Sequence, residues 1–168
     1  MKAKWIYYPG DYELMLFNKV MIRRYERDVI IPPFWRMDNF YQNVKFRKKF
    51  SITKEQIATV KVDGKFNIDL DGPEHFIYDF DGNLKLTPGD HEIVITVYNS
   101  VELPTIYVTS DELISDESWI VTCNDHKFVN AASENFVDIN VSPNKYSLPV
   151  KEIEPKKVEV VGGKVLYD

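Results

Sequence analysis

The chain has 168 residues, of which 44% are hydrophobic, 14% aromatic and 28% charged, which predicts one globular domain, or one domain with part of a second. Its one cysteine, Cys123, excludes an internal disulfide, and we expect this thiol to be a small buried side chain. The net charge of −5 argues against nucleic-acid binding, and no apolar run approaches the roughly 18 residues of a membrane span.

Positive and negative charges are concentrated in different parts of the chain. Residues 18–54 carry ten Lys/Arg against three Asp/Glu, a net of +7, whereas residues 63–119 carry two against thirteen, a net of −11. Nucleic-acid binding requires a broad basic face, so this distribution indicates a local site, or docking against an acidic neighbour, instead.

The first forty residues differ in pattern from the rest. Apolar residues recur at helical spacing across Tyr12–Glu26, which predicts a helix there with Asp11 as the candidate N-cap. Pro32 and Pro33 then require an extended connection.

Short segments with a period of two follow one another from residue 41, with turn signals about every eight to twelve residues. In the longest of them, Ile93, Ile95 and Val97 fall on one face. The pattern predicts an all-β fold, an antiparallel β-sandwich of jelly-roll type. The expected strands are 43–50, 57–62, 66–72, 75–80, 84–86, 91–99, 105–110, 118–123, 135–141, 157–161 and 164–168.

Motifs for catalysis are sparse. The sequence has no nucleophile elbow, no zinc spacing and no cofactor motif, and no spacing singles out a pair of carboxylates. His75, His91 and His126 fall at turns or strand ends, where we expect them to be exposed to solvent.

A calcium site receives weak support. Residues 67–72 match the first half of an EF-hand loop, but Tyr78 stands where that loop needs glutamate. We interpret the segment as the acidic face of a strand followed by a turn, and we expect no metal site. Asp69 and Asp71 are the weak candidates for metal ligands.

The N-terminal segment has the residue types of a carbohydrate site. A pyranose ring can stack its C–H face on Trp or Tyr while its hydroxyls bind Arg. The alternative is that the rings pack onto the sandwich and the arginines dock against acids, and we favour this docking role. The residues that we expect to bind carbohydrate or to dock another domain are Trp5, Tyr8, Arg23, Arg24, Arg27, Trp35 and Arg36.

Four motifs occur in an order that resembles the N-terminal sandwich of bacterial alpha-L-rhamnosidases. They are "FYQNVKFRKKFSI", "IATVKVDGKFNIDLDG", "YDFDGNLKLTPGDHEIVITVYN" and "LISDESWIVT". The resemblance implies an edge strand ending in Phe50, a paired hairpin around "VDGKFNIDLDG", and a "PG" corner followed by a long buried strand. The ending "VVGGKVLYD" resembles the start of the next sandwich in such enzymes.

The resemblance also implies a division into parts and a role. Residues 1–40 are expected to be a helical and Pro-rich segment packed on the sandwich, 41–160 a galactose-binding-like sandwich, and 161–168 the start of a following domain. In that family, two acids of a downstream (α/α)6 barrel hydrolyse terminal alpha-L-rhamnose with inversion, so no catalytic residue is assigned here. We therefore expect a non-catalytic accessory domain whose partners are the downstream catalytic and β-sandwich domains, and rhamnose-containing glycans.

Two other functions remain open from the sequence: an autonomous carbohydrate-binding module, and an interaction or adhesion sandwich unrelated to glycosidases. The compartment is also open. It is periplasmic or extracellular if a signal peptide has been removed, and cytoplasmic otherwise.

Overall fold

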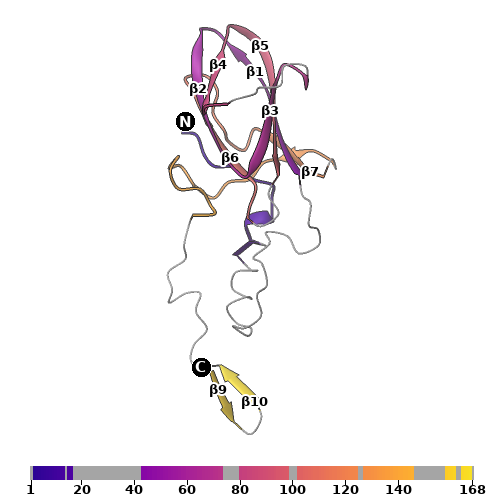
Figure 1. Cartoon of the computed structure of the whole chain (residues 1–168), viewed down its shortest axis with the longest axis vertical. Helices are drawn as coiled ribbons and strands as arrows, with labels where there is room; N and C mark the ends of the chain where they lie inside the picture. The colour runs from indigo at the N-terminus through magenta and orange to yellow at the C-terminus, as the bar shows by residue number, and fades with distance from the viewer. Residues whose placement is uncertain are drawn as a thin grey trace.

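The computed structural model describes residues 2–13, 15–16, 43–73, 80–98, 102–124, 127–145, 158–161 and 164–167. Two antiparallel sheets face each other in Figure 1, one with the strand order β3-β5-β1-β7-β8 and the other with the order β4-β2-β6. The predicted antiparallel sandwich is therefore confirmed. The strands are β1 (Asn43–Ile52), β2 (Gln56–Asp63), β3 (Lys65–Leu70), β4 (Asn83–Leu86), β5 (Gly89–Tyr98), β6 (Thr105–Thr109), β7 (Ile120–Cys123), β8 (Val129–Asn130), β9 (Val158–Val161) and β10 (Lys164–Tyr167).

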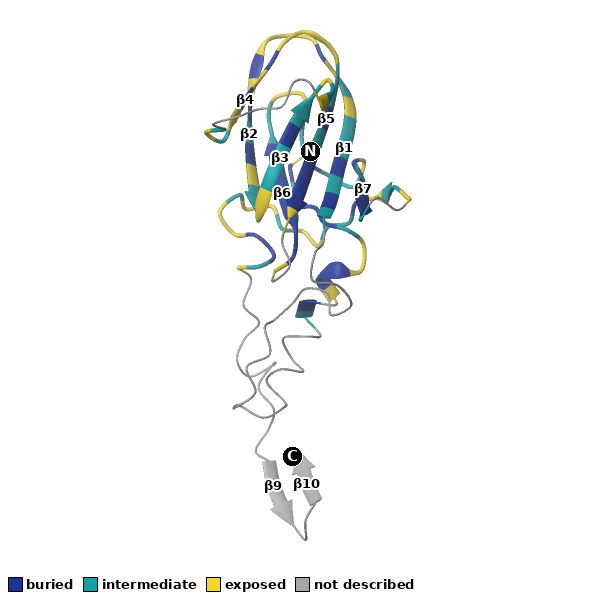
Figure 2. Cartoon of the chain, turned by 45° about the vertical axis from the view of Figure 1, so that its right-hand side comes forward, coloured by how far each residue is buried: buried dark blue, intermediate teal, exposed yellow. Residues whose placement is uncertain are grey.

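Alternation along the strands determines which face is buried. In β1 and β5, Val44 lies opposite Val97 and Phe46 opposite Ile95, and all four side chains are fully buried. Their strand neighbours point the other way, and Lys45, Arg47 and Val94 stay partly accessible whereas Thr96 is buried; Figure 2 shows the mixture of dark blue and teal along these strands. Successive residues of a strand point to opposite faces, so the predicted inner face of this sheet is confirmed.

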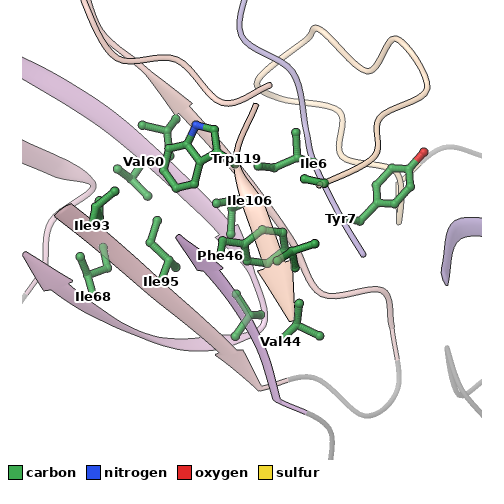
Figure 3. Close-up of a cluster of buried hydrophobic side chains, with 14 of the residues drawn as sticks. Ile6, Tyr7, Val44, Phe46, Val60, Ile68, Ile93, Ile95, Ile106 and Trp119 are labelled. Carbon is green, nitrogen blue, oxygen red and sulfur yellow. The ribbon is translucent and has the colours of Figure 1, made fainter. Parts of the chain in front are cut away.

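The core fills the space between the two sheets. Figure 3 shows Phe46 and Ile95 of the five-stranded sheet meeting Val60 and Ile106 of the three-stranded sheet, with Trp119 beside them. The indole N–H of Trp119 donates to the Ile114 carbonyl at 2.8 Å, so this large ring is buried without leaving its polar atom unpaired. Cys123 is also buried, as predicted.

The predicted hairpin around Gly64 is wrong. Only Gly64 separates β2 from β3, and its φ of 121° is a conformation that favours glycine. Asp63 pairs with Thr105 in one sheet, whereas Lys65 pairs with Tyr98 in the other. The turn exists, but it carries the chain from one sheet to the other instead of folding it back on itself.

A second crossover lies between β4 and β5, at Pro88 and Gly89, where the corner was predicted. Gly89 has a φ of 128°, again in the region that side chains disfavour. The expectation of an edge strand ending in Phe50 is wrong, because β1 extends to Ile52 and is paired on both sides, with β5 and with β7.

The predicted strand over residues 135–141 is wrong as well. Asn135 has a positive φ of 64°, and the carbonyls of this loop bind the N-terminal segment. The backbone N–H of Trp5 donates to the Phe136 carbonyl at 2.8 Å, and its indole N–H donates to the Asp138 carbonyl at 2.8 Å. These acceptors are therefore used by a distant segment and not by a neighbouring strand.

The N-terminal segment is built into the sandwich. Ile6 forms an isolated bridge with Ile106 of β6, and Tyr7 forms one with Ala132. Residues 11–13 and 15–16 are helical, and the remainder of the predicted helix lies outside the described residues. None of the described residues belongs to a helix with the length and apolar character that a membrane crossing requires.

The last two predicted strands are confirmed. β9 and β10 pair antiparallel, with Lys164 opposite Val161 and Tyr167 opposite Val158. The expected domain boundary between residues 160 and 161 falls inside β9. The predicted strand over 75–80 lies outside the described residues, apart from Phe80.

Candidate functional site

The outer face of the five-stranded sheet contains a hollow of about 630 Å³, which we call the outer-face hollow. Its floor is formed by Val94 and Thr96 of β5, whose side chains are short. The adjacent strands β1 and β3 contribute longer polar side chains on either side. The residues that line it are Lys45, Arg47, Asn67, Asp69, Gly72, Pro73, Glu92, Val94, Thr96, Tyr98 and Phe128.

Strand register places these side chains in rows. Arg47, Val94 and Asp69 are cross-strand neighbours, and Lys45, Thr96 and Asn67 form the next row. Neighbouring strands lie about 4.8 Å apart, so the two walls stand on backbones separated by about 10 Å. A cation, Arg47, and an anion, Asp69, thus face each other across the apolar side chain of Val94.

Aromatic rings lie at the rim of the outer-face hollow. The guanidinium of Arg47 lies 4.2 Å from the centroid of the Phe128 ring, in cation–π geometry that holds its long side chain in one place. The Asn67 amide lies 3.4 Å from the hydroxyl of Tyr98, a long hydrogen bond. Tyr98 is 45% exposed, so part of its ring stays available to a ligand.

A second hollow, of about 770 Å³, lies beside the first and shares Gly72 and Glu92 with it. The imidazole of His91 lies here, with Nδ1 2.7 Å from Oδ2 of Asp71 and Nε2 2.6 Å from the Thr87 carbonyl. The other carboxylate oxygen of Asp71 accepts the backbone N–H of Glu92 at 2.9 Å. Both oxygens of Asp71 therefore have structural partners.

The expected exposure of His91 is wrong, because its side chain is 10% exposed. Along β5, His91 shares a face with Ile93, Ile95 and Val97 and so closes the end of the core. The hydrogen bond to Asp71, followed by that to the Thr87 carbonyl, raises the pKa of His91 above its usual value. Acceptors on both ring nitrogens favour the imidazolium.

Glu112 organises a loop at the same end of the sandwich. Its carboxylate accepts hydrogen bonds from the hydroxyl and backbone N–H of Thr53, from the backbone of Lys54 and from the Gln56 amide. These donors, that of the Thr53 hydroxyl first, lower the pKa of Glu112. The carboxylate thus fixes the β1–β2 connection, which is a structural role.

The structure places two of the candidate site residues inside the domain. Trp5 is 2% exposed and packs against Tyr107, with ring centroids 5.6 Å apart. Its ring has no open face that a sugar could cover. Tyr8 is partly buried and packs against the main core.

The other candidates in the N-terminal segment lie outside the described residues. They are Arg23, Arg24, Arg27, Trp35 and Arg36. Of the weak metal candidates, Asp69 lies on β3 in the outer-face hollow, and Asp71 follows that strand with a φ of 61°. The described residues contain no group of three or more His, Cys, Asp or Glu side chains that could hold a metal ion.

Sequence reasoning did not identify the outer-face hollow. The alternation of Lys45 and Arg47 on β1, and of Asn67 and Asp69 on β3, is visible in the sequence but typical of any solvated face. What brings them together is the register with β5, which places the short side chains of Val94 and Thr96 between them. That register depends on sheet order, which local pattern does not give.

Comparison with protein families identifies the family to which most of the chain is similar. A family model described as "Alpha-rhamnosidase-like, bacteroidetes, N-terminal" matches residues 44–168, and the match therefore includes the outer-face hollow, His91 and the β9–β10 pair. A comparison with curated proteins gives no match.

Proposed function

The chain belongs to the family of N-terminal domains of alpha-rhamnosidase-like proteins of Bacteroidetes, and we propose on this basis that it is a non-catalytic accessory domain of a glycoside hydrolase. Hydrolysis of terminal alpha-L-rhamnose is then the task of a separate (α/α)6 barrel in the same protein. The observation that carries the proposal is the family match over residues 44–168.

The roles of the titratable side chains support the proposal. His91 and Asp71 bind each other and the backbone, Glu112 holds the β1–β2 connection, and Asp63 accepts hydrogen bonds from Ser142 and Asn144. A general acid or base must reach a substrate proton, and side chains that hold loops together are poorly placed for that.

The proposal predicts no turnover by the purified 168-residue chain on 4-nitrophenyl alpha-L-rhamnopyranoside. Asp69 and Glu92 both line the outer-face hollow, and as diagonal neighbours on β3 and β5 they stand about 7–8 Å apart, with their Cβ atoms somewhat closer. Carboxyl groups about 6.5–9.5 Å apart are typical of inverting glycosidases, so the double variant D69N/E92Q is the matched control. Turnover by the unchanged 168-residue chain that is absent in D69N/E92Q contradicts the proposal.

The proposal extends to the basic N-terminal segment as a docking element. Its net positive charge suits an acidic face on a neighbouring domain of the same protein. The variants R23A/R24A and W35A should each bind separately expressed downstream domains more weakly than the wild type does. Binding of the wild type should also weaken as the salt concentration rises. The variant K65A removes an exposed lysine of β3 and should bind like the wild type. Equal binding by all variants contradicts the docking role.

A further inference from the structure

We propose that the outer-face hollow binds a rhamnose-containing oligosaccharide. The location follows from the structure of the sheet face, whereas the choice of rhamnose rests on the proposed function. The shape of the sheet face favours a small ligand, because the short side chains of Val94 and Thr96 lie between long polar ones in a trough of about 630 Å³, where Val94 is partly accessible and Thr96 is 6% exposed. Small-molecule sites in proteins typically have volumes of about 300–1,000 Å³.

The walls of the outer-face hollow carry both hydrogen-bond donors and acceptors. A sugar hydroxyl both donates and accepts a hydrogen bond, so its site needs donors and acceptors close together. Arg47 supplies donors on the β1 wall, Asp69 supplies acceptors on the β3 wall, and the Asn67 amide supplies both. Glu92 adds an acceptor at one end of the trough. Its Oε2 atom lies 3.8 Å from Nζ of Lys49 in an exposed ion pair.

Two aromatic rings, those of Tyr98 and Phe128, lie at the rim of the outer-face hollow. Tyr98 follows Val94 and Thr96 on the same face of β5, at the end of the floor. The centroid of the Phe128 ring lies 4.2 Å from the guanidinium of Arg47. The open part of the Tyr98 ring can take the apolar C–H face of a pyranose. Stacking on Phe128 fixes the Arg47 side chain before a ligand arrives, which reduces the entropy cost of binding.

The same composition argues against other occupants. Nucleic acid requires a basic surface, and Asp69 and Glu92 would repel its phosphates. The buried centre of a protein interface is depleted in Asp, Glu and Lys, whereas Lys45, Asp69 and Glu92 line this hollow itself. Alternating donors and acceptors over a small floor suit a hydroxyl-rich ligand best.

The test is a ¹H–¹⁵N NMR titration of the 168-residue chain with L-rhamnose and with a rhamnogalacturonan oligosaccharide. Both should move the amide signals of Asn67, Val94 and Thr96, and the oligosaccharide should bind more tightly because it fills more of the trough. R47A and D69A should each weaken binding at least tenfold while their thermal unfolding midpoints stay within about 2 °C of the wild type. K85A, on the outer face of the other sheet, is the matched control and should bind unchanged.

Two results overturn the inference. One is the absence of signal changes at this face with either ligand at saturating concentration. The other is a set of changes around Ile57 and Lys85 on the opposite sheet that R47A and D69A do not affect. The two proposals fail separately, because the aryl rhamnoside assay tests catalysis by the chain and the titration tests only this face.

Discussion

The Nδ1 atom of His91 lies 2.7 Å from the Oδ2 atom of Asp71, and this contact ties the start of β5 to the end of β3. The Nε2 atom of the same ring donates to the Thr87 carbonyl, which lies in the crossover between the two sheets. One imidazolium thus joins three backbone segments at the end of the core that it closes.

Stability should decrease as pH rises through the titration of His91. Its folded pKa is raised, chiefly by Asp71, so its contribution is complete below the unfolded value of about 6.5 and disappears as pH passes the folded value. A hydrogen-bonded charge of this kind contributes about 1 kcal/mol, or about 2–4 °C in the unfolding midpoint. Thermal unfolding of the wild type between pH 5 and 9 measures it.

The variants D71N and H91Q test the origin of that pH dependence. Asp90, Glu92 and Lys49 also line this hollow, so the variant and wild-type curves must be compared over the same range. We expect both variants to be less stable at pH 5.5 and to lose most of the decline that the wild type shows above pH 6.5. A decline of unchanged size in both variants shows that another group is responsible.

Glu112 should produce the opposite pH dependence in acid. Its folded pKa is lowered, first by the Thr53 hydroxyl, so its stabilisation is present above the unfolded value of about 4.5 and disappears as pH falls through the folded value. The variant E112Q should therefore show a shallower fall in unfolding midpoint between pH 5 and 3 than the wild type. Equal slopes for the two proteins contradict this role.

Trp5 should act through packing and not through a ligand. The change W5A removes a buried ring from its contact with Tyr107 and should cost about 3–5 kcal/mol of folding free energy. W5F keeps a ring but loses the hydrogen bond to the Asp138 carbonyl, and should cost less. Chemical denaturation measures both, with K65A as the control, since that exposed lysine of β3 should change stability by about 0.5 kcal/mol or less.

Cys123 should resist thiol reagents in the folded protein. Its side chain is 3% exposed and lies opposite Val44 on the inner face of the sheet. Labelling by a colorimetric disulfide reagent should be complete in strong denaturant and slow without it, because modification then waits for local opening. Rapid labelling of folded protein, absent in C123A, contradicts this burial.

Local pattern predicted the strands well because alternation is a property of each strand alone. The faces of β1 and β5 follow directly from Phe46 and Ile95 and their neighbours two residues away. The burial of His91 could have been predicted in the same way, since it lies two residues before Ile93. The expected exposure followed from the position of His91 near a strand end, but its burial follows from the face of β5 that it shares with Ile93.

Sheet membership could not be predicted in this way. The glycines at positions 64 and 89 indicate turns, but whether a turn folds a strand back or carries it to the opposite sheet depends on distant partners. The outer-face hollow has the same dependence, because Arg47 and Asp69 are 22 positions apart in sequence and meet only through Val94. Residues 135–141 form a loop and not a strand, because the Phe136 carbonyl accepts a hydrogen bond from Trp5, more than a hundred residues away.

The hydrogen bond from the Trp5 indole to the Asp138 carbonyl joins residues 133 positions apart, which has a consequence during protein synthesis. Ribosomes add about 5–20 residues per second, so Trp5 waits on the order of ten seconds before its acceptor has been made. Ile6 and Tyr7, in the same aromatic-rich segment, likewise lack their bridge partners until residues 106 and 132 have been made. The segment made earlier is thus among the last to fold, and it is the part of the nascent chain on which we expect chaperones to act.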